Sequence, residues 1–143
     1  YGLGRLLSDL GEADGAEQAF VRAAQSSRAR WVRERAMHDL AYLLKRQERR
    51  AEALPWWEEL ARSAGALNAY EELAKHYEWH AGDLDQALVW TREAIDLVRQ
   101  WPRGAKRRAA LAELEHRMAR LEGKLAGQAA ADPAAAGAVE DED

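Results

Sequence analysis

The sequence predicts an all-α fold, in which three helix-turn-helix repeats form a short α-solenoid and a capping helix closes its C-terminal end. The composition, with 32% charged residues and three prolines in 143 residues, favours helices over strands. Apolar residues recur at the three- and four-residue spacing of a helix face. The pattern of small and large residues also repeats, because its marker alanines Ala16, Ala53 and Ala87 lie 37 and then 34 residues apart.

Each repeat is expected to contain two helices joined by a short turn, with small residues letting the helices approach and large residues filling the grooves between them. The repeats cover about residues 1–28, 30–64 and 67–100, and the capping helix covers residues 105–124. The expected helices span residues 1–10 and 15–26, 30–46 and 50–64, 67–80 and 84–100, and 105–124.

The second repeat contains two departures from an ideal helix pair. Glu48 occupies the turn position where the other repeats have a glycine. Pro55 lies just past the first turn of the expected helix 50–64, so we expect a slight bend there and not a break. Trp57, one turn after Ala53, is expected to belong to the core.

The third repeat matches the other two if one residue is inserted in the turn before Gly82. Its two helices also have start signals. Asp83, with Gln86 three residues later, and Asn68, with Glu71 three residues later, are typical of capping residues, so each is expected to cap the helix that follows it.

The last expected helix carries an apolar stripe on one side and charges on the other, as a terminal repeat requires. The stripe is formed by Leu111, Leu114, Met118, Leu121 and Leu125. The solvated face is formed by Arg108, Glu115, Arg120 and Glu122. Residues 1–124 are therefore expected to form the folded domain.

Residues 125–143 are expected to form a disordered acidic tail. This segment is rich in alanine and acidic residues, and it cannot bury enough apolar surface to offset the entropy lost on ordering. The tail contains no lysine or arginine, so it accounts for the acidic balance of a chain whose net charge is −4. The folded body is left close to neutral, with local basic surfaces.

The repeated positions carry a resemblance to a known family. They are Leu3-Gly4, Leu7, Gly11, Ala16, Phe20 and Ala23; Leu40-Ala41, Leu44, Glu48, Ala53, Trp57 and Leu60; and Leu73-Ala74, Tyr77, Gly82, Ala87, Thr91 and Ala94. This spacing resembles the tetratricopeptide repeat over roughly residues 1–100. The resemblance implies that the first helix of each repeat lines a concave groove that binds a partner. Mapping the register places in that groove Arg5, Asp9, Arg35, His38, Tyr42, Lys45, Arg46, Asn68, Lys75, Glu78 and Trp79.

A narrower resemblance rests on three segments, which are Leu43–Gln47 with Glu52–Ala61, Glu72–Glu78, and Leu114–Leu121. They look like the C-terminal helical region of bacterial proteins whose N-terminal half is a ribonuclease-H-like, exonuclease-type domain. The resemblance implies that any catalytic carboxylates belong to a domain outside this chain. Since the helical pattern is already running at Tyr1, we expect the chain to be the C-terminal part of a larger protein.

The sequence contains no motif that is typical of a catalytic or cofactor-binding site. The chain has no cysteine, no glycine-rich phosphate loop and no nucleophile-elbow motif, so we expect no enzymatic activity and no cofactor. Glu72, His76 and His80 share one helix face, but they span about 12 Å, too far for one metal ion. No membrane span or signal peptide is visible, and we expect a cytoplasmic protein without a membrane partner.

The predicted function is therefore that of a non-catalytic scaffold for protein–protein or interdomain contacts. The groove leans basic, and a second basic cluster ends the expected helix 30–46 with Lys45, Arg46, Arg49 and Arg50. Such a surface suits an acidic or extended peptide, a neighbouring domain of the parent chain, or a nucleic-acid strand. The alternative function is an accessory nucleic-acid-binding module of a ribonuclease-H-like nuclease. Arginines that only solvate helix ends are the third interpretation of these clusters.

Overall fold

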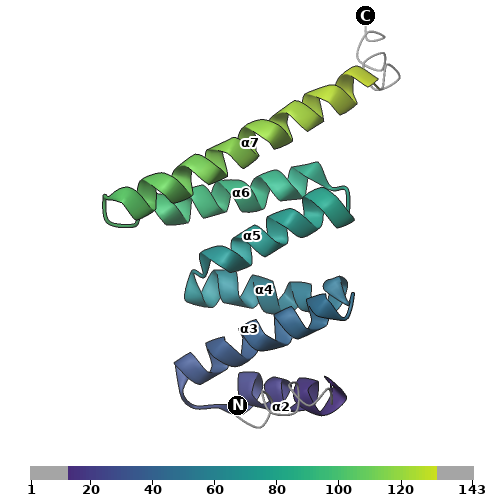
Figure 1. Cartoon of the computed structure of the whole chain (residues 1–143), viewed down its shortest axis with the longest axis vertical. Helices are drawn as coiled ribbons and strands as arrows, with labels where there is room; N and C mark the ends of the chain where they lie inside the picture. Colours follow the sequence, from purple (N-terminus) through teal and green to yellow (C-terminus); the bar gives the residue numbers. More distant parts are fainter. Residues whose placement is uncertain (1–12, 132–143) are drawn as a thin grey trace, which may run out of the picture. The chain divides into compact units, whose positions relative to one another are not determined.

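The computed structural model describes residues 13–131, and its elements in that range are all helical (Figure 1). They are α2 (Ala13–Ser26), α3 (Arg30–Arg46), α4 (Arg50–Ala64), α5 (Leu67–Lys75), the π-helix η1 (His76–His80), α6 (Leu84–Arg99) and α7 (Ala105–Ala131). The predicted all-α fold is confirmed for the described residues, none of which lies in a strand. The helix expected over residues 1–10 falls outside them.

The chain divides into two compact units, unit 1 (Tyr1–Leu73) and unit 2 (Ala74–Asp143), and each is described by itself. Unit 1 contains α2, α3, α4 and most of α5, while unit 2 contains η1, α6 and the described part of the chain after it. Among the helices between residues 13 and 131, none is both long enough and apolar enough to cross a membrane.

Unit 1 buries its apolar side chains between consecutive helices, with α2 packed on α3 and α3 on α4. The marker alanines Ala16 and Ala53 are almost fully buried. This agrees with their expected role as small contact points where neighbouring helices pack closely. Trp57 is 3% exposed and confirms the expected core position. Helix α4 runs through Pro55 without a break, because a proline so close to the helix start removes only one backbone hydrogen bond.

The turn between α3 and α4 places Glu48 in a left-handed backbone conformation, with φ at +60°. This is the position where the repeat pattern has a glycine, and the structure confirms that the turn needs a positive φ there. The Glu48 carboxylate forms an ion pair with Arg50, the first residue of α4.

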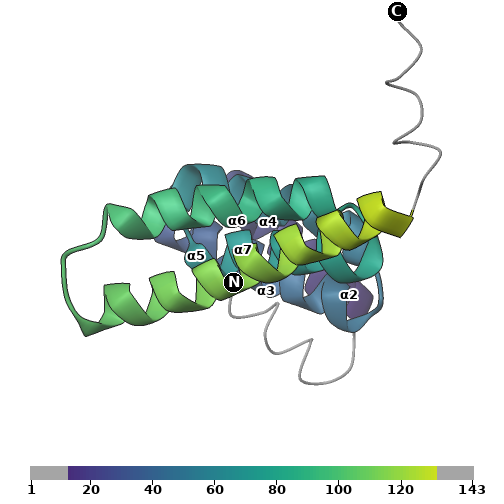
Figure 2. The same cartoon turned by 90° about the horizontal axis from the view of Figure 1, so that it is seen from above.

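Unit 2 is built around the pair formed by α6 and α7, which lie side by side in both views of the chain (Figures 1 and 2). A compact apolar cluster joins them. It consists of buried Leu84, Ala87, Leu88 and Leu121, with Tyr77, Met118 and Leu125 partly buried against it.

The inserted residue of the third repeat is accommodated by the π-helix η1. The Ala81 N–H donates to the His76 carbonyl at 2.9 Å, a hydrogen bond that spans five residues in place of the usual four. Gly82 follows with φ at +66° and ends this wider turn. Asp83 then caps α6, since its side chain accepts a hydrogen bond from the Gln86 N–H at 3.1 Å, as predicted.

Helix α7 is longer than the sequence analysis expects. It continues past residue 124 to Ala131, so residues 125–131 of the expected tail are helical. Leu125 packs against the apolar cluster of unit 2, and the alanines that follow have the highest helix propensity of all residues. The remainder of the expected tail, residues 132–143, lies outside the described residues.

Candidate functional site

Unit 1 brings several of the predicted groove residues together on α3 and α5. His38, Tyr42 and Lys45 lie on successive turns of α3 and share one face of that helix. Asn68 of α5 contacts two of them, because its amide nitrogen is 3.2 Å from His38 Nδ1 and 3.3 Å from the Tyr42 hydroxyl. Helix α5 begins at Leu67, so Asn68 lies inside the helix. This corrects the expectation that Asn68 caps it.

The hydrogen bonds of Asn68 determine which groups this face offers as donors. An amide nitrogen can only donate, so His38 Nδ1 accepts and the ring hydrogen lies on Nε2. The Tyr42 oxygen also accepts from Asn68 and keeps its own hydrogen for donation. Burial, with a smaller contribution from the Arg35 charge, lowers the pKa of His38, so the imidazole is neutral at pH 7. The result is a neutral centre with hydrogen-bond donors.

Trp57 of α4 supports this centre from the core. Its ring and the Tyr42 ring form a T-shaped pair with centroids 4.8 Å apart, and its ring and the His38 ring form a similar pair with centroids 6.0 Å apart. Such edge-to-face pairs are favourable beyond the area they bury. Because Trp57 is itself buried, His38 and Tyr42 rest on a rigid support.

Cations surround the neutral centre. The Lys45 ammonium pairs with Glu72 at 2.7 Å and lies 5.9 Å from the centre of the Tyr42 ring. Arg35 and Arg46 are exposed, and no described carboxylate forms an ion pair with Arg46. We call Arg35, His38, Tyr42, Lys45, Arg46 and Asn68 the α3–α5 surface.

The basic cluster expected at the end of α3 is smaller than the sequence suggests. Arg49 pairs with Glu17 of α2 and with Glu52 of α4, both at 2.6 Å, and Arg50 pairs with Glu48. Together with the Lys45–Glu72 pair, these ion pairs neutralise three of the four cations and leave Arg46. Only Lys45 and Arg46 of that cluster belong to the α3–α5 surface.

The other predicted groove residues are distributed differently. Arg5 and Asp9 lie outside the described residues. Lys75, Glu78 and Trp79 belong to unit 2, where Lys75 and Trp79 are exposed and Glu78 is buried. Glu78 and Trp79 are both in η1, so the wide turn of the third repeat determines their positions.

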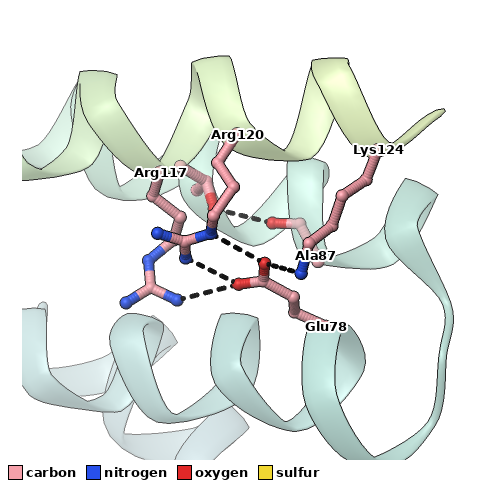
Figure 3. A network of polar contacts seen from close by, with 6 residues as sticks. Glu78, Ala87, Arg117, Arg120 and Lys124 are labelled. Atoms are coloured by element: carbon pink, nitrogen blue, oxygen red, sulfur yellow. Dashed lines mark hydrogen bonds and ion pairs between the residues drawn. The ribbon is translucent and has the colours of Figure 1, made fainter. Parts of the chain in front are cut away.

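Glu78 is held by three cations of α7 (Figure 3). Arg120 reaches both carboxylate oxygens, at 2.8 and 3.0 Å. Lys124 donates to one of these oxygens at 2.7 Å, and Arg117 approaches the other at 3.4 Å. The Glu78 side chain is completely buried, while each cation stays partly exposed. We call these four residues the Glu78 cluster.

The charge state of Glu78 follows from two opposing effects. Burial alone would raise the pKa of its carboxyl group, because a buried charge loses its hydration. The hydrogen bonds and charges of Arg120 and Lys124 outweigh burial and lower the pKa of Glu78 to about 2. Glu78 is therefore ionised at every physiological pH, and the same hydrogen bond raises the pKa of Arg120.

Trp79 lies beside the Glu78 cluster and is 60% exposed as a residue. The Lys124 ammonium is 3.6 Å from the ring centroid, and the Arg120 guanidinium carbon is 5.7 Å from it. Both are cation–π contacts, which hold the ring in place next to the positive charges. Trp79 and Lys124 also line a hollow of about 410 Å³ beside the end of α7.

One stretch of unit 1 matches a known family of repeats. Residues 35–67, which include most of α3 and all of α4, match the family model described as the tetratricopeptide repeat. Over these residues the chain is similar to one tetratricopeptide repeat. A search among curated proteins gave no match. The narrower resemblance to ribonuclease-H-like proteins stays a prediction.

The spacing of the repeat positions indicated the residues of the α3–α5 surface. The partners of Glu78 could not be predicted in the same way. Arg120 was expected on the solvated face of the capping helix, and the structure corrects this, since Arg120 binds a buried carboxylate. The signal available was the row of cations Arg117, Arg120 and Lys124, which recur every three or four residues along one helix. When such a row of cations faces the packed helices and not the solvent, an anion on a neighbouring helix is needed to balance the charge.

His76 and His80, which share a helix face with Glu72, are not joined by its carboxylate into a set of three ligands. Their rings stack with centroids 6.1 Å apart, while the Glu72 carboxylate pairs with Lys45. Within residues 13–131, no group of three or more potential ligand side chains is placed to hold a metal ion.

Proposed function

We propose that this protein is a non-catalytic interaction module, which binds an extended acidic segment of another protein, or of another domain of its parent chain, on the α3–α5 surface. One observation carries the proposal. The hydrogen bonds of Asn68 leave His38 Nε2–H and the Tyr42 hydroxyl as donors, with the cations Lys45, Arg35 and Arg46 nearby.

This combination fits the chemistry of an extended peptide. A peptide in an extended conformation has backbone carbonyls without partners, and these accept from neutral donors such as Tyr42. Acidic side chains along the same peptide pair with exposed cations, which also speed association. Tetratricopeptide repeats in general mediate protein–protein contacts, and the match of residues 35–67 to that family supports this class of function.

The test uses the whole chain and two double variants with the same change in charge. Arg35→Glu with Arg46→Glu inverts two cations of the α3–α5 surface, while Arg22→Glu with Arg28→Glu inverts two exposed cations elsewhere in unit 1. The probe is a fluorescein-labelled twelve-residue peptide of alternating acidic residues and alanine. Binding is followed by fluorescence anisotropy at about 50 mM salt, where surface charges are weakly screened.

The peptide is expected to bind the wild type, to bind the first variant at least about tenfold more weakly, and to bind the second variant within about twofold of the wild type. Equal effects of the two variants, or no binding to the wild type, would overturn the proposal. A labelled twelve-nucleotide deoxythymidine strand is measured in parallel. Tighter binding of that strand, lost in the first variant, would favour the nucleic-acid-binding alternative.

A further inference from the structure

The Glu78 cluster contains more positive charge than its internal carboxylate neutralises. Arg117, Arg120 and Lys124 all pair with Glu78, and in the described part of the chain no other carboxylate pairs with them. Three cations against one anion leave a surplus of two positive charges. Because their side chains are 18 to 34% exposed, this surplus is available to an anion from solvent.

The exposed Trp79 ring adjoins the same charges. Lys124 and Arg120 lie near the ring and hold it, so the indole loses little freedom when a second molecule packs on it. Tryptophan and arginine are the side chains most often found as anchors in protein interfaces. The surface therefore combines a fixed aromatic ring with unneutralised positive charge.

The hollow beside Trp79 supplies space for an apolar side chain. Its volume is about 410 Å³, and several of its lining residues are small. It is lined by Gly82, Leu84, Gly127, Gln128 and Ala131, together with Trp79, Lys124 and Glu78, whose carboxylate is already paired with the three cations. A bulky apolar side chain would reach the hollow while a carboxylate beside it pairs with Lys124.

We propose that Trp79, Arg120 and Lys124 form a second docking surface, in unit 2, for an acidic protein segment that carries a bulky apolar side chain next to its carboxylates. This proposal does not depend on the α3–α5 surface of unit 1. The two can fail separately, because the residues tested are different and lie in different units.

A protein segment fits this surface better than a nucleic-acid strand. The three cations span about 10 Å along α7, at the rise of 1.5 Å per residue. Beyond Lys124 the lining residues are the uncharged Gly127, Gln128 and Ala131. A single strand needs cations that follow its backbone over several phosphates, whereas one or two carboxylates need only a short row.

The test observes Trp79 directly in the whole chain. Each tryptophan gives one indole N–H signal in a ¹⁵N-correlated NMR spectrum, and the signal that disappears in Trp79→Phe belongs to Trp79. The signal of Trp31, which is 70% exposed and belongs to unit 1, is assigned with Trp31→Phe and serves as the matched control. The probe is a blocked peptide with the sequence Glu-Phe-Glu-Phe-Glu, and its partner probe has glutamine in place of each glutamate.

The acidic peptide is expected to shift the Trp79 signal in a saturable way and to leave the Trp31 signal in place. Lys124→Gln is expected to weaken this binding about fivefold, while Arg99→Gln, an exposed cation at the end of α6, leaves it unchanged. A spectrum with unchanged dispersion shows that each variant is folded.

Four results would overturn the proposal. They are no shift at millimolar peptide, an equal shift with the glutamine peptide, unchanged affinity in Lys124→Gln, and a shift of the Trp79 signal by a ten-nucleotide deoxythymidine strand at lower concentration than by the acidic peptide. The last result would assign the surface to nucleic acid.

Discussion

Glu72 in unit 1 and Glu78 in unit 2 are both partnered by cations, but the two carboxylates are held in different ways. Glu72 pairs with Lys45, and its side chain stays 11% exposed. Glu78 is completely buried and pairs with three cations. The polar residues of the α3–α5 surface are otherwise joined by neutral hydrogen bonds through Asn68.

This difference teaches how the repeat pattern tolerates polar residues. A carboxylate that keeps some exposure needs fewer charged partners, because water still reaches it. A carboxylate that is completely buried needs its full set of hydrogen bonds, because desolvation would otherwise destabilise the fold. Unit 2 is therefore expected to depend on pH through Glu78, and the neutral centre of unit 1 is expected to depend on packing and hydrogen bonds.

The largest effect is expected for Glu78→Ala. Removing the carboxylate leaves three cations close together without an anion, which is expected to lower the free energy of unfolding by about 2–4 kcal/mol. Glu72→Ala, which leaves the partly exposed Lys45 without this carboxylate, is expected to cost about 1 kcal/mol or less. Urea unfolding followed by circular dichroism measures both, and equal losses would remove the distinction between the two carboxylates.

A pH titration is expected to show the next largest effect. The pKa of Glu78 is lowered from its ordinary value of 4.5 to about 2 in the folded protein. Its stabilisation is therefore nearly complete above about pH 5 and disappears as the pH falls towards 2, with an expected loss of about 3 kcal/mol. The measurement is the free energy of unfolding of the wild type minus that of Glu78→Gln between pH 6 and pH 2. A difference that stays constant over this range would show that the carboxylate is not held as described.

Asn68→Ala tests the neutral centre of unit 1. The substitution removes the hydrogen bonds to His38 and Tyr42, and it is expected to cost about 1–2 kcal/mol of unfolding free energy. Because no ion pair is broken, the loss is expected to be the same at 50 mM and at 500 mM salt. A strong dependence on salt would show that charge, and not the amide, organises this surface.

The smallest effect concerns the two turns with positive φ. Glu48→Gly is expected to stabilise the protein by about 0.5–1 kcal/mol, because glycine adopts a φ of +60° without the side-chain clash that glutamate meets. The lost ion pair with Arg50 is largely exposed on the Glu48 side and contributes little.

Gly82→Ala is the reverse experiment in unit 2. An added Cβ at Gly82 meets no atom within 4 Å, so the expected loss of about 1 kcal/mol comes from its φ of +66° alone. Thermal unfolding of both variants provides the check. A stabilising Gly82→Ala or a destabilising Glu48→Gly would show that backbone conformation does not control these turns.

Much of the fold could be predicted from the sequence because the repeat signals are local. The helices expected over 30–46 and 50–64 coincide with α3 and α4, and the cap at Asp83 is present. The spacing of small and large residues determines which helix faces pack, and it needs no knowledge of distant residues. The inserted residue before Gly82 was visible as well, although its conversion into a π-helix was not.

The parts that were missed depend on contacts between residues far apart in the sequence. Asn68 is a residue type that often caps helices, yet its amide forms a hydrogen bond with a histidine 30 residues earlier. Glu78 matches a groove position of the repeat, yet its partners lie 39 to 46 residues later. The extension of α7 to Ala131 depends partly on the packing of Leu125 against residues of unit 2. Periodicity within one helix cannot reveal such partners.

The central claim is that the α3–α5 surface binds an acidic segment, and mapping of backbone amide NMR signals tests it most directly. On addition of the twelve-residue acidic peptide, we predict that the shifts within unit 1 concentrate between Arg35 and Arg46 and at Asn68, and that the Tyr42 ring signals move with them. Shifts within unit 1 that concentrate on α2, or that spread evenly over its helices, would contradict the account.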